Sequence, residues 1–127
     1  MSFGSETAGV TAVEFAFVVP VFIIMVFGIV EFGQGLKVHN ELDHAVSRAA
    51  RLIMIDNDVA PATVETEVRT FLSALDQGGL SVNMTSNTVD GRDYRIVTLS
   101  YPYELSVPMA SGININLSAT IGVPLRL

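Results

Sequence analysis

The 127-residue sequence has no cysteine and no tryptophan, and only 7 lysine and arginine residues against 13 aspartate and glutamate residues. Without cysteine the chain has no disulfide bonds, no thiolate nucleophile and no cysteine-ligated zinc site. The formal net charge of −6 and the lack of a basic cluster do not fit binding to the phosphate backbone of a nucleic acid, so we expect no nucleic-acid partner. The length allows one small domain, which has to fold without covalent cross-links.

Charge is also missing from a long stretch near the amino terminus. Residues 15–30 are uncharged and almost entirely apolar, and Glu14 and Glu31 bracket them. At about 1.5 Å per helical residue the two carboxylates stand roughly 25 Å apart, and the uncharged flanks extend the helix to about the 30 Å of a bilayer's hydrocarbon core. We therefore expect one membrane-spanning helix over residues 10–36. Pro20 lies inside it and should favour a kink.

The residues on either side of this run indicate whether it is cleaved off as a secretory signal and how it is oriented in the membrane. A cleaved secretory signal would begin with basic residues and end in small residues, and neither feature is present, so the helix should stay attached to the chain. No lysine or arginine precedes the run, whereas Lys37, Arg48 and Arg51 follow it. By the positive-inside rule this count favours a cytoplasmic carboxyl-terminal domain.

Two patterns indicate helices beyond the apolar run. Residues 34–54 continue the first helix with apolar side chains spaced three and four apart, namely Leu42, Ala45, Val46, Ala49, Leu52 and Ile53. Residues 63–75 have a second amphipathic pattern, formed by Val64, Val68, Phe71, Leu72 and Leu75. Gly78 and Gly79 predict the end of this second helix.

Strand patterns follow the helices. Apolar and polar residues alternate over 80–84 and 113–121, residues 95–105 are rich in strand-forming side chains, and Asp90-Gly91 is a turn signal. We expect Pro102 and Pro108 at an edge or a bend. The order helix, helix, strand, strand, strand predicts a small α+β domain with a three-stranded, mostly antiparallel sheet packed on the helices.

A short motif at the start of the apolar run points to a family. The sequence from Gly9 to Phe15, a glycine followed by four residues, a glutamate and an aromatic residue, resembles the processing site of class III prepilins. The apolar run with its Pro20, the exit Glu31-Phe32-Gly33 and the later AVSRAARL resemble TadE-like minor pseudopilins of tight-adherence pili. The resemblance covers about a third of the chain.

This resemblance implies a processing and assembly pathway. A prepilin peptidase would cut between Gly9 and Val10 and remove a leader of residues 1–9, with Glu14 and Phe15 acting in processing and assembly. Residues 10–36 would span the bacterial inner membrane and contact lipid. Residues 37–127 would form a periplasmic domain and could enter a surface pilus, with other pilins, pseudopilins and the assembly platform as partners. The leader lacks the basic residue expected of the family, and the implied orientation is opposite to that given by the charge count.

The sequence offers little for catalysis. His39, Asp43 and His44 could share a helix face, but a catalytic zinc normally takes three protein ligands, so an exposed helix surface is the better interpretation. No Gly-x-Ser-x-Gly turn and no phosphate-binding loop is present. We expect an assembly component without enzymatic activity, cofactor or metal.

Two alternatives stay open at this stage. The chain could be a single-pass anchored periplasmic binding module that never enters a filament, or a small anchored metal-dependent enzyme that uses the His39 cluster. The sequence also leaves two roles for Tyr94, Tyr101 and Tyr103, namely packing within the sheet or a surface that binds another subunit.

Overall fold

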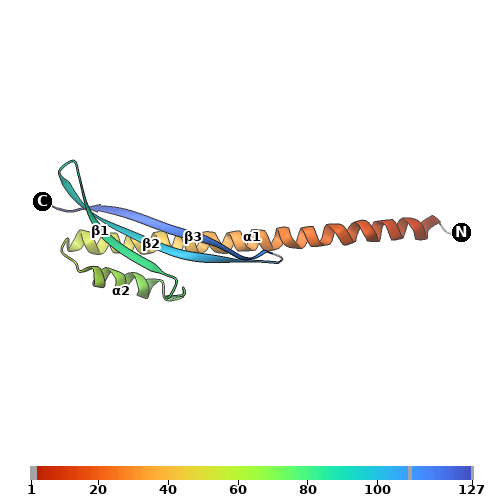
Figure 1. Cartoon of the computed structure of the whole chain (residues 1–127), viewed down its shortest axis with the longest axis horizontal. Helices are drawn as coiled ribbons and strands as arrows, with labels where there is room; N and C mark the ends of the chain where they lie inside the picture. The colour runs from red at the N-terminus through yellow and green to blue at the C-terminus, as the bar shows by residue number, and fades with distance from the viewer. Residues whose placement is uncertain (1–2, 109, 127) are drawn as a thin grey trace.

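The computed structural model describes residues 3–108 and 110–126, with side chains for residues 8–108 and 112–126. The elements are α1 (Phe3–Ile55), α2 (Pro61–Phe71), β1 (Ser81–Val89), β2 (Arg92–Val107) and β3 (Ala110–Pro124). Figure 1 shows α1 as a long rod, with its amino-terminal half projecting away from α2 and the sheet. The predicted α+β fold, with two helices and a three-stranded antiparallel sheet, is confirmed.

Helix α1 is continuous over 53 residues, or about 80 Å at 1.5 Å per residue. It runs through Pro20, which has no N–H to donate to the carbonyl of Ala16. The kink expected at Pro20 stays a prediction. The part of the chain described by the structure contains one helix that is long and apolar enough to cross a membrane.

The two halves of α1 differ in how they expose apolar side chains. In the amino-terminal half they are exposed around the helix, with Phe15, Phe17 and Ile29 at 68%, 75% and 70% exposure. In the carboxyl-terminal half one face is buried under the sheet and α2, through Leu42, Ala45, Val46, Ala49, Ala50 and Ile53. The predicted stripe is therefore correct except at Leu52, which is only partly buried, and Ala50 lies in the core instead.

Helix α2 differs from its prediction at both ends. It begins at Pro61, because a proline at the first helical position loses no helical hydrogen bond, and it ends at Phe71 rather than at residue 75. Beyond it Gln77 Nε2 donates to the carbonyls of Leu72 and Leu75, at 2.8 and 3.1 Å. These bonds satisfy carbonyls at the helix end without a further helical turn.

Phe71 was predicted on the apolar face of α2 and lies outside the core. Phe71 is 38% exposed, and the Arg48 guanidinium lies over its ring, 4.9 Å from the ring centroid. Val64, Val68 and Leu72 are the residues of this helix region that are buried. The apolar face of α2 is thus narrower than the sequence pattern indicates.

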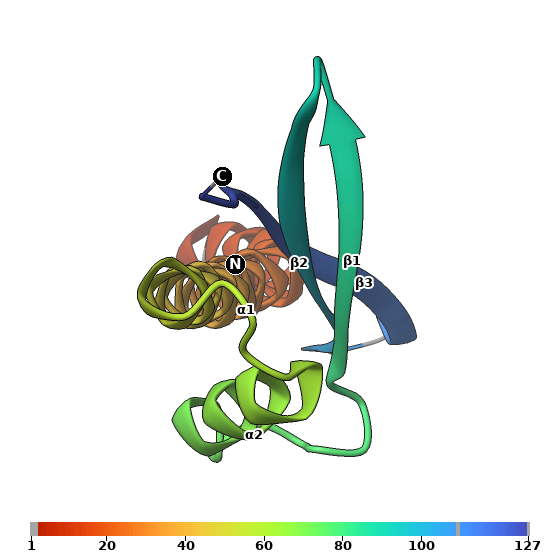
Figure 2. The ribbon, with the colours of Figure 1, turned by 90° about the vertical axis from the view of Figure 1, so that its left-hand side faces the viewer.

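The sheet has the order β1-β2-β3 with both pairs antiparallel. Asp90 and Gly91, with φ values of 52° and 78°, form the turn between β1 and β2, as predicted. Figure 2 shows this hairpin projecting away from α1, while α2 packs on another side of the helix. Val97 and Leu99 of the central strand are fully buried against the helices.

Both predicted proline positions are confirmed. The pairing of β1 with β2 extends along β2 only as far as Ser100, the partner of Ser81. Pro102 therefore lies where β2 pairs with β3 alone. Pro108 follows β2 directly and lies in the turn before β3. The sheet therefore narrows to a two-stranded hairpin, which runs along α1 toward the apolar amino-terminal half of the helix (Figure 1).

The first prediction concerns the autonomy of the domain. Among the side chains that the structure describes, all buried apolar residues lie from Leu42 onward, so a fragment that begins at Gln34 retains this core. We expect it to be soluble and to melt cooperatively, with mixed helix and sheet signals in circular dichroism. An aggregated or unstructured fragment would show that the domain depends on the apolar half of α1.

The second prediction tests the packing of the central strand. Leu99 of β2 is fully buried where the sheet packs on the helices, so Leu99→Ala in the same fragment should lower the free energy of unfolding by about 2 to 5 kcal/mol. Thr85→Ala, at an exposed position of β1, is the matched control and should change it by less than about 1 kcal/mol. Urea titration followed by circular dichroism measures both, and equal effects would contradict the packing described above.

Candidate assembly helix and the groove beside it

The residues that resemble a prepilin processing site lie on the projecting end of α1. Val10 is 61% exposed, Glu14 and Phe15 are exposed, and a Cβ built at Gly9 would meet no atom within 4 Å. Val10 and Glu14 are four residues apart, which places them on the same face of the helix. The whole motif is thus open to a partner along one side of α1.

Glu14 has no hydrogen bond or ion pair within the part of the chain that the structure describes. Its carboxylate stands beside exposed apolar side chains such as Val13, Phe15 and Phe17. A carboxylate in a membrane-spanning helix is costly and usually marks a functional position. Pro20 lies farther along the same exposed surface, and the structure brings none of these residues into contact with the sheet.

Glu31, at the other end of the apolar run, has a partner. The Tyr103 hydroxyl donates to Glu31 Oε2 at 3.0 Å and lies 3.5 Å from Gln34 Oε1. The pKa of the Tyr103 phenol lies above its usual value because burial disfavours the phenolate, and because the Glu31 carboxylate accepts a hydrogen bond from the neutral phenol and would repel a phenolate. The phenol therefore remains a donor at neutral pH.

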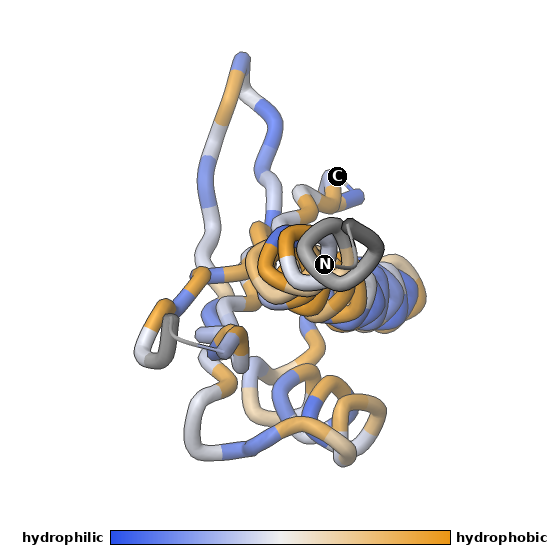
Figure 3. The backbone as a smooth tube through the Cα atoms, turned by 90° about the vertical axis from the view of Figure 1, so that its right-hand side faces the viewer, coloured by the Kyte–Doolittle hydropathy of each residue, from blue (hydrophilic) through white to orange (hydrophobic). Residues whose placement is uncertain are grey.

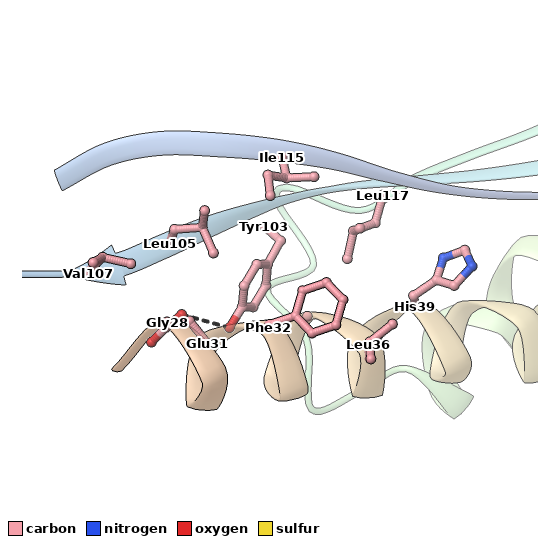
Figure 4. A pocket seen from close by; sticks show the side chains of 11 residues that line it. Gly28, Glu31, Phe32, Leu36, His39, Tyr103, Leu105, Val107, Ile115 and Leu117 are labelled. Atoms are coloured by element: carbon pink, nitrogen blue, oxygen red, sulfur yellow. Dashed lines mark hydrogen bonds between the residues drawn. The ribbon is translucent and has the colours of Figure 1, made fainter. Parts of the chain in front are cut away.

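A groove surrounds this hydrogen bond. It encloses about 450 Å³ between α1 and the paired ends of β2 and β3. Its walls are mostly apolar, and Figure 4 shows Phe32 and Leu36 of α1 facing Tyr103, Leu105, Ile115 and Leu117 of the strands. Sequence reasoning missed both the groove and the role of Glu31, because Glu31 and Tyr103 are 72 positions apart and no local pattern links them.

The three tyrosines do not form one surface. Side chains alternate along β2, so Tyr101 and Tyr103 point toward α1 with Val97 and Leu99, whereas Tyr94 lies on the opposite face of the sheet. Tyr101 packs against the core, and Tyr103 lines the groove. Packing within the domain is therefore the role of two of them.

The histidine cluster lies on the exposed surface of α1. His39 Nε2 lies 3.6 Å from Asp43 Oδ2, and their side chains are 40% and 57% exposed. His44 is exposed on the same helix, and within the described residues no group of three or more His, Cys, Asp and Glu side chains could hold a metal ion.

The distribution of hydropathy separates the two ends of the molecule. Figure 3, viewed from the amino-terminal end, shows the near part of α1 coloured mainly hydrophobic, while hydrophilic positions alternate along the projecting β1–β2 hairpin. The helix therefore presents an apolar rod at one end and a mixed surface at the other.

Comparison with known proteins finds a similarity within α1. A family model described as TadE-like protein matches residues 9–51, which include the motif that resembles a prepilin processing site, the apolar run and most of the part of α1 that packs on the sheet. No curated protein and no solved structure matches the chain. Residues 9–51, about a third of the chain, are thus similar to the TadE-like family, which is consistent with a protein of the tight-adherence pilus system.

Proposed function

We propose that this protein is a minor pseudopilin that takes part in the assembly or priming of a tight-adherence pilus. The observation that carries the proposal is that the TadE-like segment covers both the exposed apolar half of α1 and the half that holds the domain. The protein would act by lateral association of its apolar helix with other pilin and pseudopilin helices, in the membrane and then in a filament or at the assembly platform. It would have no catalytic activity.

The proposed topology follows from processing at the start of α1. Residues 10–36 span the inner membrane, and residues 37–127 lie in the periplasm. A prepilin peptidase cuts between Gly9 and Val10 on the cytoplasmic side. The exposure of Val10 and the open space around Gly9 support access of a protease to this bond.

Glu14 has a distinct role in this proposal. After cleavage the new amino group of Val10 lies at the same end of the helix as Glu14, one helical turn away. In an apolar bundle the carboxylate would pair with the terminal amine of a neighbouring subunit. The lack of an intramolecular partner for Glu14 in the described part of the chain supports a partner outside it.

The third prediction tests processing. Gly9→Val should block cleavage, because a side chain at Gly9 keeps the backbone away from the catalytic groups of the peptidase. Since a Cβ there meets no atom within 4 Å, the substitution should not disturb the fold. Gly33→Val, at another open glycine of α1, is the control and should be cleaved normally. Amino-terminal sequencing of the protein from cells with and without the peptidase measures this, and an uncut native chain would contradict the proposal.

The fourth prediction separates assembly from simple anchoring. A carboxylate at the centre of a spanning helix costs about 2.5 to 3.5 kcal/mol and less near the interface, so Glu14→Leu should not reduce membrane insertion. It would leave the terminal amine of a neighbouring subunit without its counter-ion, a loss of about 3 to 5 kcal/mol for a buried pair. Cross-linking to other pilins and surface piliation should therefore fall, while the membrane level and cleavage stay unchanged.

The control for this variant is Asp43→Leu, which removes an exposed carboxylate from the domain half of α1. It should leave cross-linking and piliation unchanged. If Glu14→Leu also assembles normally, Glu14 is only an edge residue of the anchor, and a binding module that stays in the membrane becomes the better explanation.

A further inference from the structure

The end of the β2–β3 hairpin lies beside the membrane-competent part of α1. The hairpin end is defined here by Leu105, Val107, Ile113 and Ile115. Leu105, Val107 and Ile115 line the groove together with Gly28, Glu31 and Phe32 of α1, and Ile113 pairs with Leu105. The hairpin end is therefore level with the last turn of the uncharged run that ends at residue 30.

This hairpin end is apolar and uncharged. The sequence has no charged residue from Leu105 to Leu125, and Ile113 and Ile115 are 46% and 45% exposed. The groove that it forms with α1 is mostly apolar, and Phe32, which lines it, is 69% exposed. The exposed apolar surface of the helix thus adjoins the sheet at Phe32.

Helix geometry sets the depth of this surface. Residues 15–30 cover about 24 Å at 1.5 Å per residue, and a hydrocarbon core is about 30 Å thick. If the uncharged run lies in the core, the lipid boundary falls at or beyond Glu31. A hairpin end that is level with Gly28 and Glu31 then lies at the boundary between acyl chains and head groups.

We propose that the hairpin end is a second membrane contact, in which Leu105, Val107, Ile113 and Ile115 lie in the lipid interface beside α1. The proposal rests on the membrane-spanning helix of the proposed function. Tyr103 fits this level, because tyrosine concentrates where an apolar ring meets polar head groups. Its hydroxyl is bonded to Glu31, so neither group enters the lipid without a hydrogen-bond partner.

Lipid is the occupant that these features favour over a second protein chain. The hairpin end has no charged side chain that would fix the register of a protein partner. Of the polar side chains that line the groove, Tyr103 and Glu31 bond each other, and His39 lies 3.6 Å from Asp43. The apolar surface of the hairpin end adjoins that of α1, which lies in lipid in the proposed topology. Acyl chains fill such a surface without demanding a matching shape.

The fifth prediction measures the depth of the hairpin end directly. The natural chain has no cysteine, so single-cysteine variants of the full-length protein each carry one spin label. Ile113→Cys reports on the hairpin end, Phe22→Cys is the reference within the apolar run, and Ser118→Cys is the control on the same strand, about 17 Å farther along it. Each variant is placed in phosphatidylcholine–phosphatidylglycerol vesicles, and its accessibility to oxygen and to a water-soluble nickel chelate is measured.

The oxygen-to-nickel ratio should be highest at Phe22, intermediate at Ile113 and lowest at Ser118. A label at Ile115 should give the same intermediate value, which covers the case in which one variant misfolds. If Ile113 and Ile115 match Ser118 while Phe22 is embedded, the hairpin contact is wrong and the anchor stands. If Phe22 itself is exposed to water, the anchor of the proposed function fails first.

A protein occupant would give a different signal. Dipolar broadening at Ile113 that disappears on dilution with unlabelled protein would assign the groove to a second copy of the chain and overturn the lipid contact. Its absence, together with the intermediate ratio, supports lipid.

Discussion

The close approach of the sheet to the carboxyl-terminal half of α1 is the contact on which the rest of the domain depends. Ala45 and Ala49 are fully buried, and their small side chains let the central strand lie close to the helix, with Val97 and Leu99 filling the space between. No polar side chain is buried among the described residues. Polar contacts lie at the periphery, where Arg95 Nη1 donates to the carbonyl of Val59 at 2.6 Å and the N–H of Arg126 donates to Asn57 Oδ1 at 2.8 Å. These bonds hold the loop after α1 against the ends of the strands.

The sequence allowed correct prediction of those features that depend on periodicity. The spacing of Leu42, Ala45 and Ala49, the alternation along the strands and the Asp90-Gly91 turn are local signals, and each corresponds to an element of the structure. The predicted end of α2 at residue 75 was wrong. Beyond Phe71 the Gln77 side chain bonds the carbonyls of Leu72 and Leu75, and the Arg69 side chain bonds those of Gln77 and Leu80. Helix propensity does not encode such contacts. The groove could not be predicted, since it forms between positions far apart in the chain whose side chains are ordinary core residues individually.

The two glutamates that bracket the apolar run have different surroundings. Glu31 accepts a hydrogen bond from Tyr103 and is tied to the domain, whereas Glu14 has no bonded partner within the described residues. In the sequence they form a symmetric pair. The fold breaks this symmetry, because the β2–β3 hairpin reaches one of them and leaves the other on the projecting rod (Figure 1). The same residue type thus supports the domain at one end and is available for a partner at the other.

Because α1 is continuous, its apolar half and the domain move together as one rigid body. No loop separates the apolar half from the half that holds the sheet, so the domain follows every tilt and rotation of the helix below it. From Glu31 to Ile55 the helix rises about 36 Å, and at the roughly 20° tilt common for spanning helices its far end moves sideways by about 12 Å. Rotation of the helix about its axis sweeps the projecting β1–β2 hairpin around it (Figure 2). A change in helix packing at the depth of the apolar run is therefore converted, without any change in the fold, into a larger displacement of the domain surface.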